Sequence, residues 1–282
     1  DASDASTFTF NGGTISQWGD KATGDGAQNL TQGNAANQPA RVINGIGGLP
    51  TVRFDGNDAL TNATNFSTPY TIFSVSRLEG TQNQRLITAV GNNWLLGYHS
   101  PGLNQMYAEG WVANQNLAAN TATHFYAANG SGALTNFYDG DTLIASNAGG
   151  IQGPNGIDLG GAFGGQFSKG DVSELLIYNS VLSAGDFAAV MDYLQARYVA
   201  PINGIPDGSQ VNIAAGATLD LNGINETIGN LAGAATGTVL LNGGNLTVNQ
   251  SSPTTFNGGI SGNGNLIKNG IDTLTLGGTN AY

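Results

Sequence analysis

Five aromatic rings in one short stretch are the residues of this sequence best suited to recognition chemistry. Aromatic rings stack on the C–H faces of sugars, and amides such as Asn93, Asn104 and Gln105 can bond sugar hydroxyls. The candidate glycan-binding residues are Trp94, Tyr98, His99, Tyr107 and Trp111. Large rings also fill the cores of β domains, and Trp is usually well buried. The stretch therefore indicates either a sugar-contacting surface or a part of the core.

Carboxylates and amides in two short segments are candidate calcium ligands, because calcium prefers oxygen donors. The candidates are Asp55, Asn57, Asp58, Asp139 and Asp141. Asp and Asn also hydrogen-bond their own backbone in turns. Calcium is thus the one cofactor that the sequence suggests, and ordinary turn chemistry is the alternative.

Nucleophilic catalysis of the Ser-His-Asp kind needs a histidine, and the chain has two, His99 and His124. No Gly-x-Ser-x-Gly turn accompanies them. His124 falls in a predicted strand, which favours a half-buried structural role, and His99 falls in a predicted loop. Two isolated histidines also argue against a zinc site.

The composition excludes several classes of partner. Of the 282 residues only 10% are charged, 44 are Gly and none is Cys, so disulfides and thiolate metal sites are absent. The net charge is −11, and the eight basic residues are dispersed along the chain. A dispersed set cannot follow a phosphate backbone, so we expect neither nucleic acid nor an anionic membrane as partner. No apolar run is long enough to insert into a bilayer.

Alternating apolar and polar residues predict β-strands through the first part of the chain. The run 70–77 places Phe73 and Val75 on one face and Ser74 and Ser76 on the other. A second run, 171–178, has the same character. These patterns predict two β-strands.

A hairpin and one helix complete this part. Asp139-Gly140 supplies the positive φ angles of a tight turn within 136–144. A helix opens at Ser183, with Asp186 three residues later as a variant of the capping box. Its apolar stripe comprises Phe187, Val190, Met191, Leu194 and Tyr198. The helix ends at Pro201 and is expected to pack on the β domain.

Beyond Pro201–Pro206 aromatic residues almost vanish, which predicts a domain boundary. The tail repeats one short strand of aliphatic and small polar residues. The copies are 217–223, 238–243, 245–249 and 272–277. A repeat of roughly 20 residues is typical of a β-solenoid, whose coils bury their apolar residues by stacking. The sequence therefore predicts a first domain at 1–200, a linker at 201–206 and a solenoid at 207–282, which we expect to be part of a longer chain.

Several segments of the first domain resemble the concanavalin A-like (laminin-G-like) lectin/glucanase superfamily. The matching segments are Asp1-Ala-Ser-Asp-Ala-Ser, Gln17-Trp-Gly-Asp20, Gln38-Pro39, Arg53-Phe-Asp-Gly56 and 170–179. This resemblance covers about residues 1–200. Residues 207–282 resemble the autotransporter-associated β-strand repeat, most closely in 256–282. The second resemblance implies a right-handed β-helix, export and a cell-surface or matrix setting.

Glucanases of the first superfamily use Glu-x-Asp-x-x-Glu on one strand, where two carboxylates act as nucleophile and acid/base. The corresponding string here is 169–174, in which Lys169 stands in place of the first glutamate. Asp171 and Glu174 are then expected to form a polar pair at a strand edge. The departure from the motif predicts that the chain is not an enzyme.

The fold class predicted from the sequence is all-β: a jelly-roll sandwich with one C-terminal amphipathic helix, followed by a right-handed β-solenoid. The predicted function is that of a secreted bacterial surface adhesin or glycan-binding protein, non-catalytic, with the solenoid as stalk. Its partner would be an extracellular polysaccharide or a cell-surface glycan. A self-assembling subunit of an extracellular fibre or surface layer is the alternative, and a polysaccharide-active enzyme is the third hypothesis.

Overall fold

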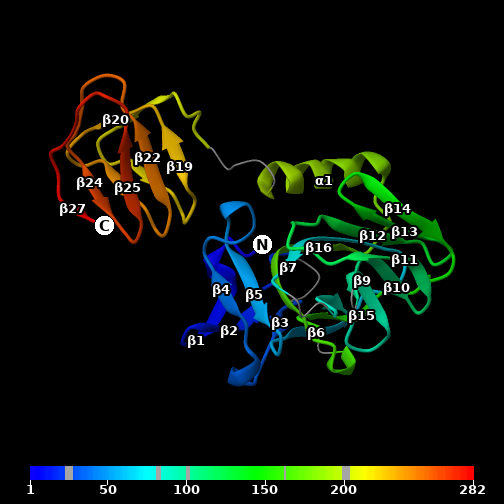
Figure 1. The fold of residues 1–282 in the computed structure, drawn as a ribbon. Coiled ribbons are helices and arrows are strands. Elements are labelled where there is room, and N and C mark those ends of the chain that lie inside the picture. Colours follow the sequence, from blue (N-terminus) through cyan, green and yellow to red (C-terminus); the bar gives the residue numbers. More distant parts are fainter. Residues whose placement is uncertain (23–27, 81–83, 100–101, 162, 199–203) are drawn as a thin grey trace. The chain divides into compact units, whose positions relative to one another are not determined.

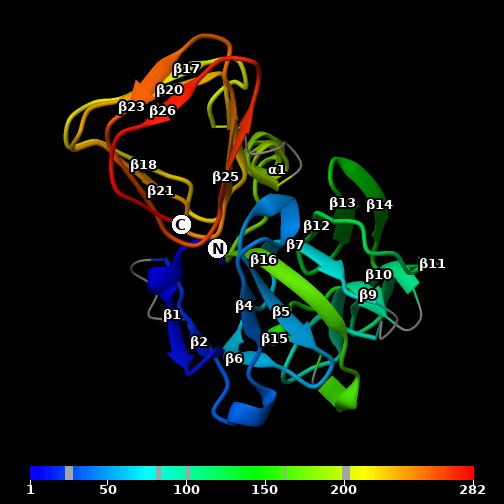
Figure 2. The same ribbon diagram turned by 60° about the vertical axis from the view of Figure 1, so that its left-hand side comes forward.

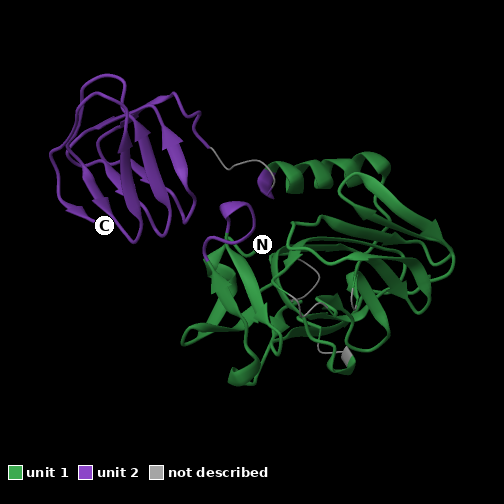
Figure 3. Ribbon diagram, in the orientation of Figure 1, with its two compact units in different colours: residues 1–42, 50–196 green, residues 43–49, 197–282 purple. Residues whose placement is uncertain are grey.

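The computed structural model describes residues 1–22, 28–80, 84–99, 102–161, 163–198 and 204–282. The chain divides into two compact units, residues 1–42 with 50–196 and residues 43–49 with 197–282 (Figure 3). Part of the predicted linker, 201–203, lies outside the described residues. No helix of the described chain is long and apolar enough to span a membrane.

The described part of the first unit contains sixteen strands and most of the helix α1 (Ala184–Tyr198) (Figure 1). The strands are β1 (Phe8–Asn11), β2 (Thr14–Trp18), β3 (Leu30–Thr31), β4 (Ala40–Val42), β5 (Thr51–Asp55), β6 (Leu60–Asn65), β7 (Tyr70–Leu78), β8 (Ile87–Thr88), β9 (Trp94–His99), β10 (Gly102–Ala108), β11 (Trp111–Ala118), β12 (Tyr126–Gly130), β13 (Thr135–Asp139), β14 (Thr142–Asn147), β15 (Asn155–Leu159) and β16 (Lys169–Tyr178). Short 3-10 turns occur at Ala5–Thr7, Ala35–Asn37, Ile46–Gly48 and Phe163–Gly165.

Hydrogen bonds join these strands into one sheet. Its order is β11-β10-β9-β8-β15-β6-β3-β2-β4-β5-β16-β7-β12-β13-β14, with β1 paired to β2. The end strands β11 and β14 contact each other, so the sheet curls back on itself like a barrel. The all-β prediction with a helix at its end is confirmed. Short strands such as β3 and β4 carry the pairing from one part of the sheet to the other.

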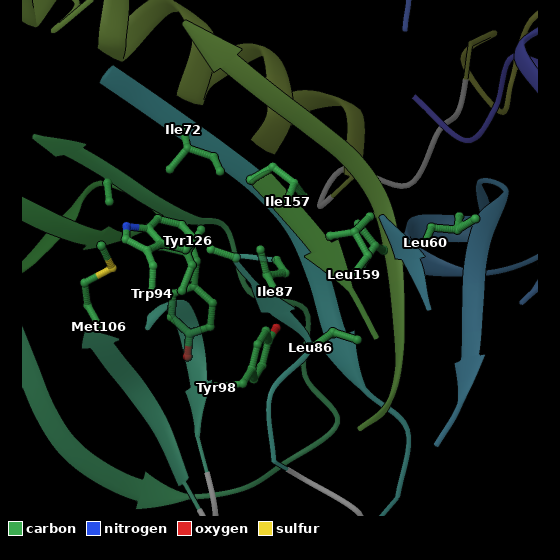
Figure 4. Packing of buried hydrophobic residues seen from close by; sticks show 14 of the residues in the cluster. Leu60, Ile72, Leu86, Ile87, Trp94, Tyr98, Met106, Tyr126, Ile157 and Leu159 are labelled. Carbon is green, nitrogen blue, oxygen red and sulfur yellow. The ribbon is translucent and has the colours of Figure 1, made fainter. Parts of the chain in front are cut away.

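The core of the first unit fills the inside of this curled sheet. Figure 4 shows the side chains of Trp94, Tyr98, Met106 and Tyr126 pointing into this core from the surrounding strands. Each of these four side chains is fully buried. Burial of such large rings is the dominant favourable contribution to folding, at about 25 cal/mol per Å² of apolar surface.

The strand predicted at 70–77 is β7, and it is buried on both faces. Ser76 faces the core, and its hydroxyl lies 2.9 Å from that of Tyr98. On the other face α1 covers Phe73, whose ring centroid lies 4.8 Å from that of Phe187. The serine face is therefore an internal polar face that bonds to a buried tyrosine.

The hairpin and the helix form in the predicted segments, but Asp139 is the last residue of β13 and Gly140 alone of the predicted pair has a positive φ. β13 and β14 pair antiparallel around Gly140, which has a φ of 56°. At the start of α1 the Ser183 hydroxyl donates to Asp186 Oδ2 at 2.7 Å, and the Asp186 N–H donates back to Ser183 Oγ at 3.2 Å. Both signals work over a few residues, so the sequence alone suffices to predict them.

A buried carboxylate ties the middle of the sheet together. In the register of β5, β16 and β7, Asp171 lies between Arg53 and Arg77. The Arg53 Nε donates to Asp171 Oδ1 and the Arg77 Nη2 donates to Asp171 Oδ2, each at 2.8 Å. Glu79 contacts both guanidinium groups from the solvent side, at 3.2 and 2.8 Å. The pairing with Asp171 raises the pKa of Arg53.

The second unit is a coil of three parallel ladders, which Figure 2 shows as the three sides of a triangle. Its strands are β17 (Gln210–Ile213), β18 (Thr218–Asp220), β19 (Glu226–Ile228), β20 (Asn230–Gly233), β21 (Thr238–Leu240), β22 (Asn245–Asn249), β23 (Thr254–Phe256), β24 (Gly259–Ser261), β25 (Asn265–Asn269), β26 (Leu274–Leu276) and β27 (Asn280–Ala281). The ladders run β17-β20-β23-β26, β18-β21-β24-β27 and β19-β22-β25. The predicted solenoid stacking is confirmed.

Two kinds of contact hold the coils of the second unit together. Inside, stacked aliphatic side chains such as Val239 and Leu246 are fully buried. At one corner, the Asn245 N–H and amide both donate to Asn225 Oδ1 at 2.9 Å. Asn265 donates in the same way to Asn245 Oδ1, at 3.1 and 2.8 Å. The side-chain oxygens of these asparagines accept hydrogen bonds from backbone N–H groups at the turns. The same bond recurs from one coil to the next because the coils repeat.

We expect the Asp171→Ala variant to lose about 2 to 4 kcal/mol of unfolding free energy, because it leaves two arginines without their buried partner. Urea unfolding followed by tryptophan fluorescence reports on the first unit, which holds Trp18, Trp94 and Trp111. The Glu79→Gln variant is the control: its side chain is 33% exposed, so we expect a loss of about 1 kcal/mol or less. Equal losses in the two variants would contradict the role given to Asp171.

Candidate functional site

The candidate surface lies on three consecutive antiparallel strands, β9, β10 and β11. In their register Tyr107 pairs with Leu95 on one side and with Trp111 on the other. The tight connection between β10 and β11 contains Glu109, which has a positive φ of 54°. Because side chains alternate across a strand, every second residue of these strands points away from the core.

The structure separates the five predicted glycan-binding residues into two groups. Trp94 and Tyr98 are fully buried in the core. The indole N–H of Trp94 donates to the Tyr70 hydroxyl at 3.3 Å. Neither ring reaches the surface. These two residues are therefore part of the core, which was the alternative interpretation of the aromatic stretch.

The other three rings gather on the outer face of the same strands. The Trp111 ring stands edge-on to the rings of Tyr107 and His99, with centroids 5.1 and 5.8 Å apart. Trp111 is 39% exposed, and the other two are half-buried. Such edge-to-face packing holds the indole in place while part of it stays accessible. We call these three rings the outer aromatic cluster.

Polar side chains border the outer aromatic cluster. The Gln105 amide donates to the His99 carbonyl at 2.8 Å and to Asn116 Oδ1 at 3.1 Å. The buried guanidinium of Arg85 donates to Gln166 Oε1 at 2.7 Å. Burial, with the charge of Arg85 nearby, lowers the pKa of His99. A neutral imidazole, amides and an exposed indole together match a ligand that carries many hydroxyl groups.

Sequence reasoning missed Arg85, whose charge acts on His99. Gln105 was among the amides named beside the aromatic stretch, and it lies two residues from Tyr107 on the same face of β10. Arg85 and Gln166 lie on segments far apart in the sequence, and only the folded chain brings them to one another.

The residues predicted to bind calcium serve turns and neighbouring side chains. Asp58 Oδ2 accepts the N–H of Asp55, and Asp55 Oδ1 accepts that of Asn57, both at 3.1 Å. Burial raises the pKa of Asp58 to about 6. Asp139 Oδ2 lies 2.7 Å from the His124 Nδ1, and Asp141 accepts a bond from an amide of α1.

Within the described parts of the chain, no three His, Cys, Asp or Glu side chains are grouped as metal ligands. The hydrogen bonds that these residues make are those of turn chemistry, and calcium binding by them stays a prediction.

The acidic residues of the glucanase-like string do not form the pair expected at a strand edge. Asp171 is enclosed by its two arginines, and Lys169 is exposed. Glu174 is buried, and both of its carboxylate oxygens lie 3.3 Å from the Tyr193 hydroxyl on α1. The two residues are separated because Asp171 pairs with arginines of the neighbouring strands, whereas Glu174 contacts Tyr193 on the helix.

No family model and no curated protein matches the chain. Among solved structures, a Trypanosoma rangeli sialidase in complex with the inhibitor DANA is 12% identical with a TM-score of 0.43. That match covers 65% of this chain and 31% of the sialidase, so the chain spans less than a third of that protein.

Two further matches are of similar quality. Domain 4 of a GH43 extracellular arabinanase from Geobacillus stearothermophilus, in complex with arabinotriose, is 14% identical with a TM-score of 0.43, over 57% of this chain and 83% of that one. A GH54 α-L-arabinofuranosidase is 14% identical with a TM-score of 0.47, over 66% and 51%.

These matches contradict the prediction that the chain is not an enzyme, because several matched chains are glycoside hydrolases. At 12 to 14% identity, likeness concerns the β fold alone. The absence of the first glutamate from the glucanase motif argues only against the hydrolytic mechanism that uses this motif. It was wrong to conclude from it that the chain is not an enzyme of any kind.

We expect the ring protons of His99 to titrate, by NMR, at a pH below the ordinary value of 6.5. Between its lowered pKa and 6.5 the unfolded chain binds more protons at this residue than the folded chain, so its contribution to stability is lost as the pH falls through this window. The His99→Gln variant should remove that part of the pH dependence. A midpoint at or above 6.5 would contradict the burial assigned to His99.

Proposed function

We propose that the first unit binds carbohydrate and that the outer aromatic cluster is its sugar-contacting surface. The observation that carries the proposal is the partly exposed Trp111 indole, held edge-on by Tyr107 and His99. A pyranose or furanose ring presents an apolar C–H face that packs on such an indole, and its hydroxyls need donors and acceptors at the rim.

The rim of the cluster supplies these polar groups. The side chain of Asn116 is exposed and has amide N–H donors to offer, while the buried Gln105 donates to Asn116 Oδ1 and holds it in place. The Gln105 amide also holds the backbone of His99, which fixes the position of the imidazole. Recognition of a neutral sugar works through such short, directional bonds placed beside an apolar ring.

We further propose that the curled sheet is a concanavalin A-like jelly roll and that the three-ladder coil is a right-handed autotransporter-type stalk. The sequence segments quoted for both families support this, as does the parallel stacking of the coils. The chain would then act at the surface of, or outside, a bacterial cell, where its partner is an extracellular polysaccharide or a cell-surface glycan. Attachment to such a glycan is the adhesive function that follows.

The arabinanase domain among the solved structures is in complex with arabinotriose, and the fold likeness to it is loose. The proposal for this chain therefore rests on the chemistry of the outer aromatic cluster and not on that likeness.

A glycan array screened with the full chain tests the proposal, and affinities for the glycans that bind are then measured by calorimetry. We expect Trp111→Ala to weaken binding about tenfold or more, because loss of an aromatic stacking partner costs about 1 to 3 kcal/mol in comparable recognition.

The control is Phe10→Ala, which removes a similarly exposed ring, 45% accessible, from β1 of the same unit. Its affinity should equal that of the unchanged chain. Unchanged binding by a folded Trp111→Ala variant would remove the cluster from the site, and no binding to any arrayed glycan would contradict the proposed function.

A further inference from the structure

The short connection between β10 and β11, which leads directly into Trp111, has a tightly constrained backbone. Glu109 has a φ of 54°, a value that residues other than Gly seldom adopt. Gly110 follows it, and a Cβ at this position would overlap the carbonyl of Gly149. Uncommon backbone conformations persist where the surrounding chain imposes them, and they cluster at functional sites. The geometry of the chain is therefore imposed immediately before the exposed indole.

On one side, the residue that precedes β9 holds the connection through a reciprocal pair of hydrogen bonds. The N–H of Asn93 donates to Glu109 Oε1 at 2.7 Å. The N–H of Glu109 donates to the Asn93 carbonyl at 3.0 Å. The backbone and the side chain of Glu109 are thus both fixed by one neighbouring residue.

On the other side, the connection is held by the four residues Asn147–Gly150 at the end of β14, which we call the strap. The side-chain amide of Asn147 donates to the Val112 carbonyl, directly after Trp111. The Oδ1 atom of the same side chain accepts the N–H of Gly149 at 2.7 Å. One amide therefore bonds both the backbone of the strap and the start of β11.

The two glycines of the strap allow it to lie against the backbone of Trp111. A Cβ on Gly149 would overlap the Trp111 carbonyl, and a Cβ on Gly150 would overlap the Gly110 carbonyl. Glycine permits two backbones to approach this closely because it has no side chain. The backbone of Trp111 is thus fixed by the bond from Asn147 to the next residue and by its contact with Gly149.

We propose that Asn147 is a positioning residue for Trp111, which fixes the start of β11 and so orients the indole toward the sugar. The inference rests on the proposed carbohydrate-binding function and deepens it. Tyr107 and His99 support the ring of Trp111, and the strap supports its backbone. A ring that is already held in its binding orientation loses less conformational entropy when the ligand arrives.

The first unit offers a matched control for the Asn147→Ala variant. The side-chain amide of Asn62, on β6, donates to the Asn29 carbonyl at 3.1 Å, and its Oδ1 accepts the N–H of Thr64 at 2.6 Å. Asn147 makes the same two kinds of bond, one to a distant carbonyl and one to the N–H two residues later. Both side chains are half-buried. Asn62→Ala therefore removes equivalent bonds without changing the strap.

The first measurement needs no sugar. NMR relaxation of the indole N–H groups compares the fast motion of Trp111 with that of Trp18 and Trp94. We expect Asn147→Ala to lower the order parameter of the Trp111 indole and to weaken its NOEs to the Tyr107 ring, and Asn62→Ala to change neither. An unchanged Trp111 indole in folded Asn147→Ala would overturn the proposal.

The second measurement is the affinity for a glycan that the array identifies. We expect Asn147→Ala to weaken binding about fivefold, in keeping with the loss of one or two hydrogen bonds, and Asn62→Ala to leave it unchanged. The double variant with Trp111→Ala should bind no more weakly than Trp111→Ala alone, because Asn147 acts through that ring. Additive losses would overturn the proposal, since Asn147 would then act independently of Trp111.

Two further outcomes separate this proposal from the proposed function. If Trp111→Ala weakens binding and Asn147→Ala does not, the positioning role is overturned and the carbohydrate surface stands. If Trp111→Ala leaves binding unchanged, both proposals are overturned together. Should Asn147→Ala not fold, Gly149→Ala replaces it, because its added Cβ displaces the Trp111 carbonyl and is expected to have the same effects on the indole and on affinity.

Discussion

The buried carboxylate of Asp171 is the interaction on which the arrangement of the first unit depends. It joins β16 to β5 through Arg53 and to β7 through Arg77, and so fixes the register of three neighbouring strands. A shift of one residue would turn every side chain of a strand to the other face. With β7 in register, Ser76 reaches Tyr98 of β9, which sets the position of the strands that carry the outer aromatic cluster.

The second unit depends on a different constraint, the need of each coil for a neighbour. A coil has too few residues to enclose its own aliphatic side chains, and it leaves strand edges open until another coil pairs with them. The bonds between Asn225, Asn245 and Asn265 repeat at one corner for the same reason. Both units thus satisfy open strand edges, the first by curling its sheet and the second by stacking.

The accuracy of the sequence analysis followed the range of the interactions involved. The capping box of Ser183 and Asp186 occurs as predicted, and the hairpin forms in the predicted segment with its turn one residue later, at Gly140 and Asp141. The repeat in the tail likewise predicted its own stacking. The alternation in 70–77 predicted a strand but not its surroundings, because a pattern of period two cannot show that a helix covers one face and a buried tyrosine the other.

The sequence by itself determined that the chain is all-β, that one helix follows the first set of strands and that the tail stacks in parallel coils. These properties arise from local propensity and from periodicity, which are present in any short window of residues. Only the tertiary structure decided that Trp94 and Tyr98 are core residues while His99, Tyr107 and Trp111 share a surface. The physical reason is that the curl of the sheet encloses one face of β9 to β11, and which face is enclosed depends on strands distant in the sequence.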